Sequence, residues 1–592
     1  MISFILARLV RAIIVMMLTV TFVFIILRLG GDPARAMLGE NATPEALAAF
    51  RTAWGLDRSI PEQFLIYLAS ALRGDFGVSA ADGREVFTVI AERIPKTLTL
   101  TISAFVLSVL VGIPAGIIAA VRRDSAADKS VMAGAVLGYS VPNFLLGLTL
   151  IFVFAVWFRV LPSSGSSTWQ HAILPVATFG LVNAAAIARF ARSALIEVLE
   201  QPYIAAARAD GIPKWEVVIR HALPNAAIPM VTMLGFVAAG LLGGSAIVET
   251  VFAWPGLGSG FVRAITLSDL NVVQAMILLF TAFMVTINLI VDVLYAVLNP
   301  KIRLQKMANT TLSLPKRQFL KSARRIPISI WLCLIWIAVV VFVGITAQWL
   351  APFDYLQQSP LARFAPPGAP GHLLGTDYLG RDVLSNILVA TQTSLMIALV
   401  GSLICAFIGT TLGFLAAHFG GWVDNLIMGF ADAKASVPFI IFALGVLAFL
   451  GSSPLILLML VGVASFERYA RLTRGLVLSA NQEGYAEAAR IVGVPSLRIY
   501  VRHVLPNIAG PLIVQITLNF PDIILLESGL SFLGLGIQPP ETSLGLMVAD
   551  GRNYIAIAWW LIALPGVVIV LTTLSISLLG DYLRDRFDAR LR

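Results

Sequence analysis

Apolar runs of about 20 residues recur along the whole chain and constrain its fold more than any other feature. A helix of that length crosses the hydrocarbon core of a bilayer, and a helix satisfies its own backbone hydrogen bonds there. We therefore predict an all-α polytopic membrane protein. Twelve spans are expected, near residues 9–28, 99–121, 131–157, 171–190, 227–250, 272–298, 329–350, 394–417, 424–450, 454–470, 509–531 and 557–580.

Composition supports a membrane protein and argues against a nucleic-acid partner. The chain has 592 residues, of which 58% are hydrophobic and only 13% are charged, whereas about a quarter of the residues of a soluble domain are charged. The net charge of +9 comes from Lys and Arg in the short segments between apolar runs, as in the cytoplasmic loops of membrane proteins. Cys333 and Cys405 both lie in apolar runs, so neither a disulfide nor a metal site is expected.

The distribution of basic residues predicts the orientation. Arg8 and Arg11 precede the first run, and further clusters follow the second, fourth and sixth runs. These clusters fall on one side if the spans alternate, and the positive-inside rule makes that side the cytoplasm. Both termini are then cytoplasmic. The first run is too long for the core of a signal peptide and is expected to be a retained span.

One polar segment occurs twice, 282 residues apart, at 203–225 and 485–507. Eleven positions of this segment are identical, and the spacing between them never changes. Because both copies lie in long apolar surroundings, they suggest a docking surface that is built twice.

Other blocks recur in the same order, so the chain contains two parallel repeats. The blocks of the first repeat are Ser140-Val-Pro, Ala188-Arg-x-x-Arg, Glu249 with Gly256-Leu-Gly, and Asn299-Pro-Lys-Ile-Arg, and those of the second begin at Ser436, Ala470, Glu527 and Asp588. We predict a first half over 1–300, a basic cytoplasmic linker over 301–326 and a second half over 327–592.

Each polar segment is predicted to form a short helix, a sharp turn and a second helix. The alanine-rich start favours a helix, Gly211 and Gly493 suit the left-handed residue that closes it, and Pro213 and Pro495 suit the start of the next. Leu223-Pro224 and Leu505-Pro506 are expected to break this second helix from the following span. An amphipathic hairpin lying on lipid is the alternative, but lipid contact does not require fixed positions of Gly and Pro.

At these residues the chain resembles the permease subunits of ATP-binding cassette importers. The second copy, Glu487-Ala-Ala-x-x-x-Gly493, matches their cytoplasmic coupling motif, whereas the first has Ala205 in place of the glutamate. A finer resemblance is to the dipeptide, oligopeptide and nickel permeases. Trp54–Asp57, Gly74–Ser79 and Trp254–Gly258 look like the B-type permease of that family, and the strings from His372 to Ser385 and from Glu527 to Gly536 look like its C-type partner.

The resemblance implies a fused B-type and C-type permease with the transmembrane fold of type I importers, in a bacterial inner membrane. It implies that two ATPase subunits dock on two coupling loops and carry ATP and Mg, and that an extracytoplasmic binding protein delivers the substrate. Only the second loop keeps the glutamate, which suggests two different ATPase subunits or a fused pair, while two identical subunits stay an alternative. The coupling residues implied are Tyr203, Ala206, Ala207, Arg208, Gly211, Pro213, Tyr485, Glu487, Ala488, Ala489, Arg490, Gly493 and Pro495.

The sequence offers no catalytic site of its own. No Gly-x-x-x-x-Gly-Lys-Ser/Thr string for binding phosphate occurs in the chain. The chain is therefore expected to be a permease subunit without a cofactor, not an enzyme. Peptides are the cargo that the resemblance favours, while opines, nickel chelates and oligosaccharides stay open.

Several charged residues lie within or close to the predicted spans, where each costs a few kcal/mol at the bilayer centre. They are expected to line the pathway, to form internal pairs, or to reach the interface from helix ends, and Asp432 and Lys434 are expected to be buried. The set comprises Asp432, Lys434, Glu467, Arg468, Asp522 and Glu527.

An ion- or proton-coupled secondary transporter is the rival function, since it also has twelve spans in two parallel halves. Such a transporter would need coupling carboxylates paired across the halves, and Asp432 has no acidic counterpart near Pro142. A scaffold or channel is a further alternative. The duplicated polar segment and the Gly375–Asp382 block argue against both.

Overall fold

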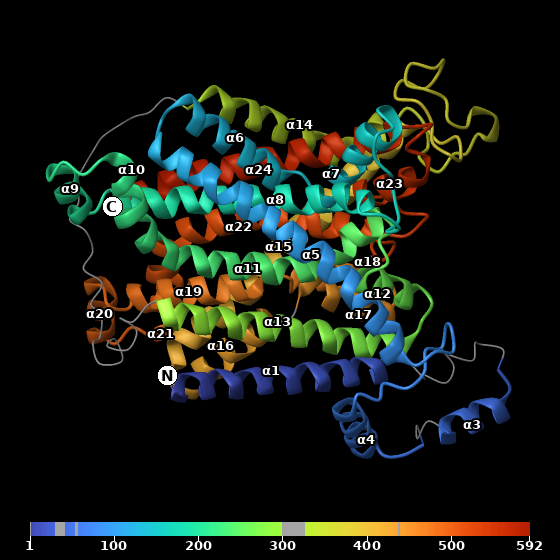
Figure 1. The fold of residues 1–592 in the computed structure, drawn as a ribbon, viewed down its shortest axis with the longest axis horizontal. Coiled ribbons are helices and arrows are strands. Elements are labelled where there is room, and N and C mark those ends of the chain that lie inside the picture. Colours follow the sequence, from blue (N-terminus) through green and yellow to red (C-terminus); the bar gives the residue numbers. More distant parts are fainter. Residues whose placement is uncertain (1, 30–41, 54–56, 299–325, 436–437, 592) are drawn as a thin grey trace. The chain divides into compact units, whose positions relative to one another are not determined.

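The fold is described from a computed structural model of residues 1–592, in which residues 1, 30–41, 54–56, 299–325, 436–437 and 592 are not described. Helices dominate the described residues, and no β-strand occurs among them beyond three isolated bridges. Figure 1 traces the helices along the chain. The predicted linker over 301–326 lies almost entirely outside the described residues.

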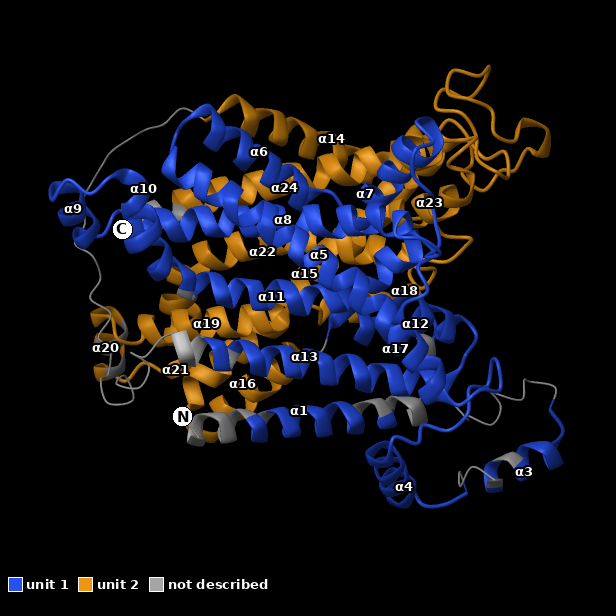
Figure 2. Cartoon of the chain, in the orientation of Figure 1, with its two compact units in different colours: residues 1–310, 436–451 blue, residues 311–435, 452–592 orange. Residues whose placement is uncertain are grey.

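The helices group into two compact units, which Figure 2 colours separately. Unit 1 comprises residues 1–310 and 436–451. Its elements are α1 (Ile2–Leu29), α3 (Pro44–Ala53), α4 (Ile60–Arg73), α5 (Val86–Val121), α6 (Ala126–Ser140), α7 (Asn143–Leu150), η1 (Ile151–Trp157), α8 (Gln170–Leu199), α9 (Pro202–Ala209), α10 (Lys214–Glu216), η2 (Val217–Ala222), α11 (Leu223–Val251), α12 (Leu257–Thr266), α13 (Leu270–Leu298) and α17 (Phe439–Leu450).

Unit 2 comprises residues 311–435 and 452–592. Its elements are α14 (Ile328–Leu350), η5 (Pro360–Ala362), α15 (Val383–Phe419), α16 (Gly421–Ala435), α18 (Pro454–Gly462), α19 (Phe466–Ala480), α20 (Gly484–Ile491), α21 (Ser496–Ile499), η6 (Tyr500–Val504), α22 (Leu505–Phe532), α23 (Leu544–Gly551), η7 (Arg552–Tyr554) and α24 (Trp560–Leu591).

The units differ from the predicted halves at α17, which belongs to the second half in sequence but to unit 1 in contacts. This helix is apolar throughout and packs against α1, α11, α12 and α13. Its Ala443 and Leu444 are fully buried. Burial of an entirely apolar helix therefore ties residues 439–450 to unit 1.

The described residues contain eight single helices that are long and apolar enough to cross a membrane, and up to ten spans if two broken pairs are included. Of the other predicted spans, the first is α1, of which Ala12–Thr21 qualifies only as a shorter apolar helix. The predicted span at 454–470 is not one helix, because α18 ends at Gly462 and α19 begins at Phe466.

Two glycine contacts fix the register of the repeats. In unit 1, a methyl group on Gly116 of α5 would lie 2.7 Å from the Ala188 carbonyl of α8. In unit 2, a methyl group on Gly413 of α15 would lie 2.6 Å from the Ala470 carbonyl of α19. Gly112 and Gly409 repeat the pattern one turn earlier, so α8 corresponds to the α18–α19 segment at an offset of 282 residues.

The two corresponding segments nevertheless differ. α8 runs unbroken over 30 residues and tolerates Pro175. Its counterpart is interrupted at residues 463–465, where Ser465 precedes α19 with φ −132° and ψ 18°. The two repeats therefore have the same helix packing but a different backbone at this point.

Candidate functional site

The first polar segment forms the predicted short helix and turn. α9 ends at Ala209, and Gly211 follows with φ +79°. The Ile212 amide donates to the Ala207 carbonyl across the turn at 3.3 Å, as in a helix end closed by a left-handed residue. Pro213 then stands immediately before α10. The expected roles of Gly211 and Pro213 in the turn are confirmed.

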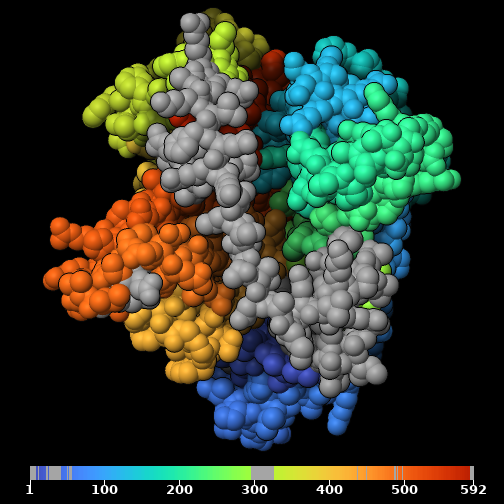
Figure 3. Space-filling view, turned by 90° about the vertical axis from the view of Figure 1, so that its left-hand side faces the viewer, coloured from blue at the N-terminus to red at the C-terminus, as the bar shows by residue number. Residues whose placement is uncertain are grey.

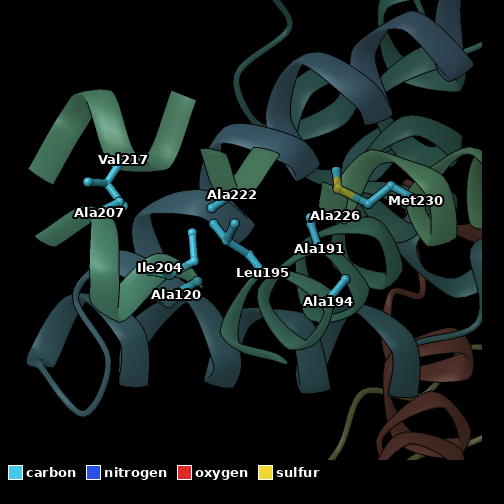
Figure 4. Packing of buried hydrophobic residues seen from close by; sticks show 10 residues of the cluster. All are labelled: Ala120, Ala191, Ala194, Leu195, Ile204, Ala207, Val217, Ala222, Ala226 and Met230. Atoms are coloured by element: carbon cyan, nitrogen blue, oxygen red, sulfur yellow. The ribbon is translucent and has the colours of Figure 1, made fainter. Parts of the chain in front are cut away.

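The inward side of this segment is anchored in an apolar cluster (Figure 4). Ile204 of α9 is fully buried, and Ala207 is 8% exposed. Both pack with Val217 and Leu195, and Ala120 of α5 joins the cluster. Ala207 was predicted among the residues that contact a partner, but it faces the protein's own core. Helical periodicity explains this, because Ala207 lies three residues after Ile204 on the same face.

The outward side of the first segment is open to solvent. Tyr203 is 44% exposed, and Ala206 and Arg208 are exposed as well. In the space-filling view, the segment forms a lobe on the surface of unit 1 (green in Figure 3). The segment is therefore a protrusion held by an internal apolar anchor, with one face left for contact.

The second segment repeats this construction. Gly493 also has φ +79°, and the Val494 amide donates to the Ala489 carbonyl at 3.1 Å. Its anchor contains Val477, Ile499 and Val504, with Ala489 packed against them. Tyr485 and Ala488 are exposed, and Pro495 precedes α21. The side chains of Glu487 and Arg490 lie outside the part of the chain that the structure describes.

The expected break at Leu-Pro is wrong. Residues 214–251 stay helical, with a π-helical turn, η2, between α10 and α11. Pro224 follows η2 in the first turn of α11, and the π turn accommodates the N–H that proline lacks, so the helix widens here and does not stop. The Asn225 amide side chain donates to the His221 carbonyl at 2.8 Å. Asn507 and His503 repeat this bond at 2.7 Å beside η6, so Leu-Pro-Asn marks a wide turn and not a break.

The outward faces of the two segments carry different chemistry. Asp210 at the end of α9 is exposed, and its counterpart Val492 is 81% exposed. Ala209 corresponds to Ile491, which is 80% exposed. The first segment therefore presents a carboxylate where the second presents two branched apolar side chains.

The charges predicted within the spans of unit 2 form internal pairs. Lys434 of α16 donates to Glu467 of α19 at 2.7 Å and also to the Ala464 carbonyl. The Lys434 side chain is 15% exposed and therefore partly buried, so its predicted burial holds in part. The Asp432 side chain is 44% exposed and lies 3.6 Å from Arg471, so its predicted burial is wrong. Residues two apart on a helix point to different sides.

Arg468 of α19 and Asp522 of α22 form a further pair at 2.7 Å. A third pair, Arg474 with Asp424, is bidentate with both bonds at 2.5 Å. Its equivalent in unit 1 is Arg192 with Asp128, bonded through the same atoms at 2.6 and 2.7 Å. Sequence reasoning missed both of these pairs, although each aspartate stands twelve residues before the shared Ser-Val-Pro block.

Glu527 is fully buried and accepts hydrogen bonds from Ser394 and Ser531. Glu249 of unit 1 is likewise fully buried and accepts from the Thr97 hydroxyl at 2.7 Å and the Ser259 amide at 2.8 Å. The Glu249 carboxyl thus links α11 to the N-terminal third of α5, and the Glu527 carboxyl links α22 to the N-terminal third of α15. Glu527 was predicted to lie on a pathway or in a charge pair. The structure gives it hydroxyl partners within unit 2.

The Thr97 and Ser394 hydroxyls occupy the same place in the two repeats. The Leu257 amide, first in α12, donates to Thr97 at 2.7 Å. The Leu544 amide, first in α23, donates to Ser394 at 3.2 Å. Sequence reasoning missed both hydroxyls, because serine and threonine within an apolar run carry no distinct signal.

The Gly375–Asp382 block builds a turn. Asp377 accepts from the amides of Leu379 and Arg381 at 2.8 Å and pairs with the Arg381 guanidinium at 2.6 Å. Asp382 caps α15 through the Ser385 amide and contacts His372 at 2.9 Å. These polar residues therefore shape a loop that precedes a long helix.

A pocket in unit 2 lies beside this turn and is lined by Asp377, Tyr378, Arg381 and Asp550, among others. Burial raises the pKa of Asp550, while the Arg381 guanidinium, 3.8 Å away, opposes the rise. Among the described residues, no group of three or more His, Cys, Asp or Glu side chains could hold a metal ion.

Comparison with known proteins assigns the family. The profile of the "Binding-protein-dependent transport system inner membrane component" family matches the chain twice, at residues 112–304 and 409–592. The profile of the N-terminal part of such membrane components matches residues 1–101.

Individual relatives match one half of the chain. The "Glutathione transport system permease protein GsiC" of Escherichia coli (strain K12) is 44% identical over 304 residues, which are 51% of this chain and 99% of the relative. The proteins of the same name from Shigella dysenteriae serotype 1 and Shigella boydii serotype 4 match to the same extent. A multi-pass helical chain with two parallel repeats and two matches to one profile belongs to the family of binding-protein-dependent transport system inner membrane components, with the fold of type I ATP-binding cassette importers.

Proposed function

We propose that the chain is the complete transmembrane pathway of an ATP-driven importer, in which a B-type and a C-type permease are fused. The observation that carries the proposal is the duplicated protruding segment, which has an apolar anchor and the same left-handed glycine in both repeats. The nearly full-length match of the relatives to one half supports two permeases in one chain.

Two ATPase subunits dock on the outward faces of α9 and α20 and supply the ATP and Mg sites. After the glycine turn, each segment continues helically into a long helix, α11 or α22, through a π turn. A force on α9 or α20 therefore passes through a short turn and the apolar anchor, and then through continuous helix, to a membrane span. The difference between Asp210 and Val492 favours two unlike ATPase surfaces, either on two proteins or on a fused pair.

Basic residues support an orientation with both termini and both coupling segments in the cytoplasm. An extracytoplasmic binding protein then delivers substrate to the opposite face of the membrane. The name of the relatives supports a small peptide as cargo, of the size of glutathione.

The coupling segments can be tested through their glycines. A side chain at Gly211 or Gly493 meets no neighbour within 4 Å, but the φ of +79° strains any L residue. In proteoliposomes that contain the chain with its ATPase and binding-protein partners, Gly211→Leu and Gly493→Leu should uncouple ATP hydrolysis from uptake. Gly475→Leu is the matched control, because Gly475 is equally unobstructed but has no positive φ. Unimpaired ATP-driven uptake in both variants would refute the coupling assignment.

A further inference from the structure

Unit 2 carries a charged face that unit 1 lacks. We define it by six side chains on α16, α19 and α22, which are Asp432, Lys434, Glu467, Arg468, Arg471 and Asp522. The positions equivalent to five of them in the first repeat are uncharged, namely Val136, Gly138, Ala185, Ala186 and Gly244. Only Arg471 has a charged counterpart, Arg189.

The register of this comparison is fixed by the structure. The glycine contacts align α19 with α8, the bidentate aspartate–arginine pairs align α16 with α6, and the buried glutamates align α22 with α11. The helix packing that the two repeats share does not require these additional charges, since the first repeat has the same packing without them.

The charged face lies beside the interruption between α18 and α19. Lys434 donates to the Ala464 carbonyl within the interruption and to Glu467 in the first turn of α19. Interrupted helices in transporters occur where their ends and flanking side chains line a substrate site. The continuous α8 offers no such ends.

The face lies at membrane depth and is accessible. Arg468 lies 14 residues after Pro454 and 12 before Ala480, so it is near the middle of a segment equivalent to the span α8. Its partner Asp522 lies within the candidate span 500–532. The Arg468, Arg471 and Asp432 side chains are 54%, 48% and 44% exposed. Charges at this depth pair with one another or face water, because hydrocarbon excludes them, so we expect the exposed parts of these side chains to face an aqueous cavity.

Three cations and three carboxylates balance on this face, so it suits a solute that carries both signs of charge. We propose that the charged face is a substrate-recognition site, and that it takes a zwitterionic solute such as a peptide with free amino and carboxyl groups. The solute carboxylate exchanges with Asp522 or Asp432 for an arginine, and its ammonium takes the carboxylate thus released. This inference rests on the proposed import function.

Thiol labelling tests both the accessibility of the face and its occupancy. Cys333 and Cys405 are first changed to alanine, and Gly429→Cys is introduced into the full chain with its partners in proteoliposomes. Gly429 is exposed and unobstructed one turn before Asp432 on α16, so the six charged side chains stay intact. A membrane-impermeant thiosulfonate should label Gly429→Cys during turnover. S-methylglutathione or trialanine at about ten times its Kd should slow that labelling about tenfold, whereas N-acetyl-trialanine amide should not. Absent labelling, or equal effects of charged and blocked peptides, would overturn the proposal.

Ala133→Cys in α6 is the matched control, since it is exposed and occupies the position in the first repeat that is equivalent to Gly429. It should show no protection that depends on peptide charge. Protection of both cysteines to the same extent would indicate a general closure of the pathway and would also overturn the assignment to unit 2.

Exchanging the charges of Arg468 and Asp522 distinguishes a role in substrate recognition from a purely structural role. The double variant Arg468→Asp with Asp522→Arg keeps an ion pair between α19 and α22 but reverses its polarity. A structural pair would be restored by the exchange, whereas a recognition pair should show an uptake KM raised about tenfold for trialanine with ATP turnover retained. A wild-type KM in the exchanged variant would overturn the proposal. Failure of the proposed import function would give a different result from failure of this recognition site, because the wild-type chain itself would then show no ATP-driven uptake.

Discussion

The segment that precedes each of the duplicated polar segments, 203–225 and 485–507, is continuous in unit 1 and interrupted in unit 2. α8 and the α18–α19 segment share their glycine contacts with α5 and α15 and their bidentate aspartate–arginine pair. They differ in the backbone at 463–465 and in the charges beside it. Shared features therefore identify what the fold requires, and unshared features identify where the repeats have separate tasks.

The largest effect is expected at the shared glycines. Gly116→Leu and Gly413→Leu would each force a side chain against the backbone of the facing helix. Overpacking of this kind costs about 1–3 kcal/mol or more, so both variants should lose folded protein to a similar extent. Thermal unfolding in detergent measures this loss, with Gly134→Leu and Gly475→Leu as unobstructed controls. A stable Gly413→Leu beside an unfolded Gly116→Leu would contradict the shared packing.

A symmetrical effect of comparable size is expected at the buried carboxyls. Glu249→Ala leaves the Thr97 hydroxyl and the Ser259 amide without their acceptor. Glu527→Ala does the same to Ser394 and Ser531. Each unsatisfied buried group costs about 1–3 kcal/mol. Both variants should therefore lower the unfolding midpoint, and glutamine at either position should recover part of it. Unequal decreases in the unfolding midpoint would show that the two carboxyls do not have equivalent roles in the two repeats.

The bidentate pairs should respond less than the buried carboxyls. The Arg192 and Arg474 side chains keep 23% and 36% exposure, so solvent screens part of the loss when Asp128→Asn or Asp424→Asn removes the charge. We expect about 1 kcal/mol in each case. Glu62→Gln, which breaks the exposed pair with Arg58, serves as the control and should be nearly neutral. A large loss of stability in Asp424→Asn without a similar loss in Asp128→Asn would show that the two pairs are not equivalent, and would group the Asp424 pair with the charges that only unit 2 carries.

The smallest effect on stability is expected from exchanging the outward faces of the coupling segments. Asp210→Val and Val492→Asp alter exposed positions, so the free energy of unfolding should change by about 0.5 kcal/mol or less. The exchange should nevertheless alter which ATPase subunit each segment binds, as measured by site-specific crosslinking from Tyr203 and Tyr485. Unchanged crosslinking would show that this difference between the segments does not select a partner.

The repeat and its helices could be predicted because apolar runs and identical spacings are visible in sequence. The glycine turn of the polar segments could also be predicted, since Gly211 and Pro213 have strong backbone preferences. The π turn could not, because a Leu-Pro pair looks the same whether a helix stops or widens. Which alanines of the segment are exposed also depended on the tertiary anchor around Ile204.

The interruption before Phe466 was hidden by composition. Residues 454–466 are as apolar as a continuous span, and only the backbone at 463–465 shows that two helices replace one. The position of α17 was hidden for the same reason, since an apolar helix carries no mark of the neighbours against which it will pack. Partners of charged residues likewise came from the fold, as Lys434 and Glu467 are 33 residues apart.

The import function is tested most directly by the energy source for uptake, measured with the full chain in proteoliposomes together with its ATPase and binding-protein partners. An ATP-driven importer should take up the cargo of a loaded binding protein only when ATP is present, and this uptake should persist when ionophores abolish every ion gradient. Uptake that continues without ATP and collapses with the ion gradient would contradict ATP-driven import and would indicate a secondary transporter.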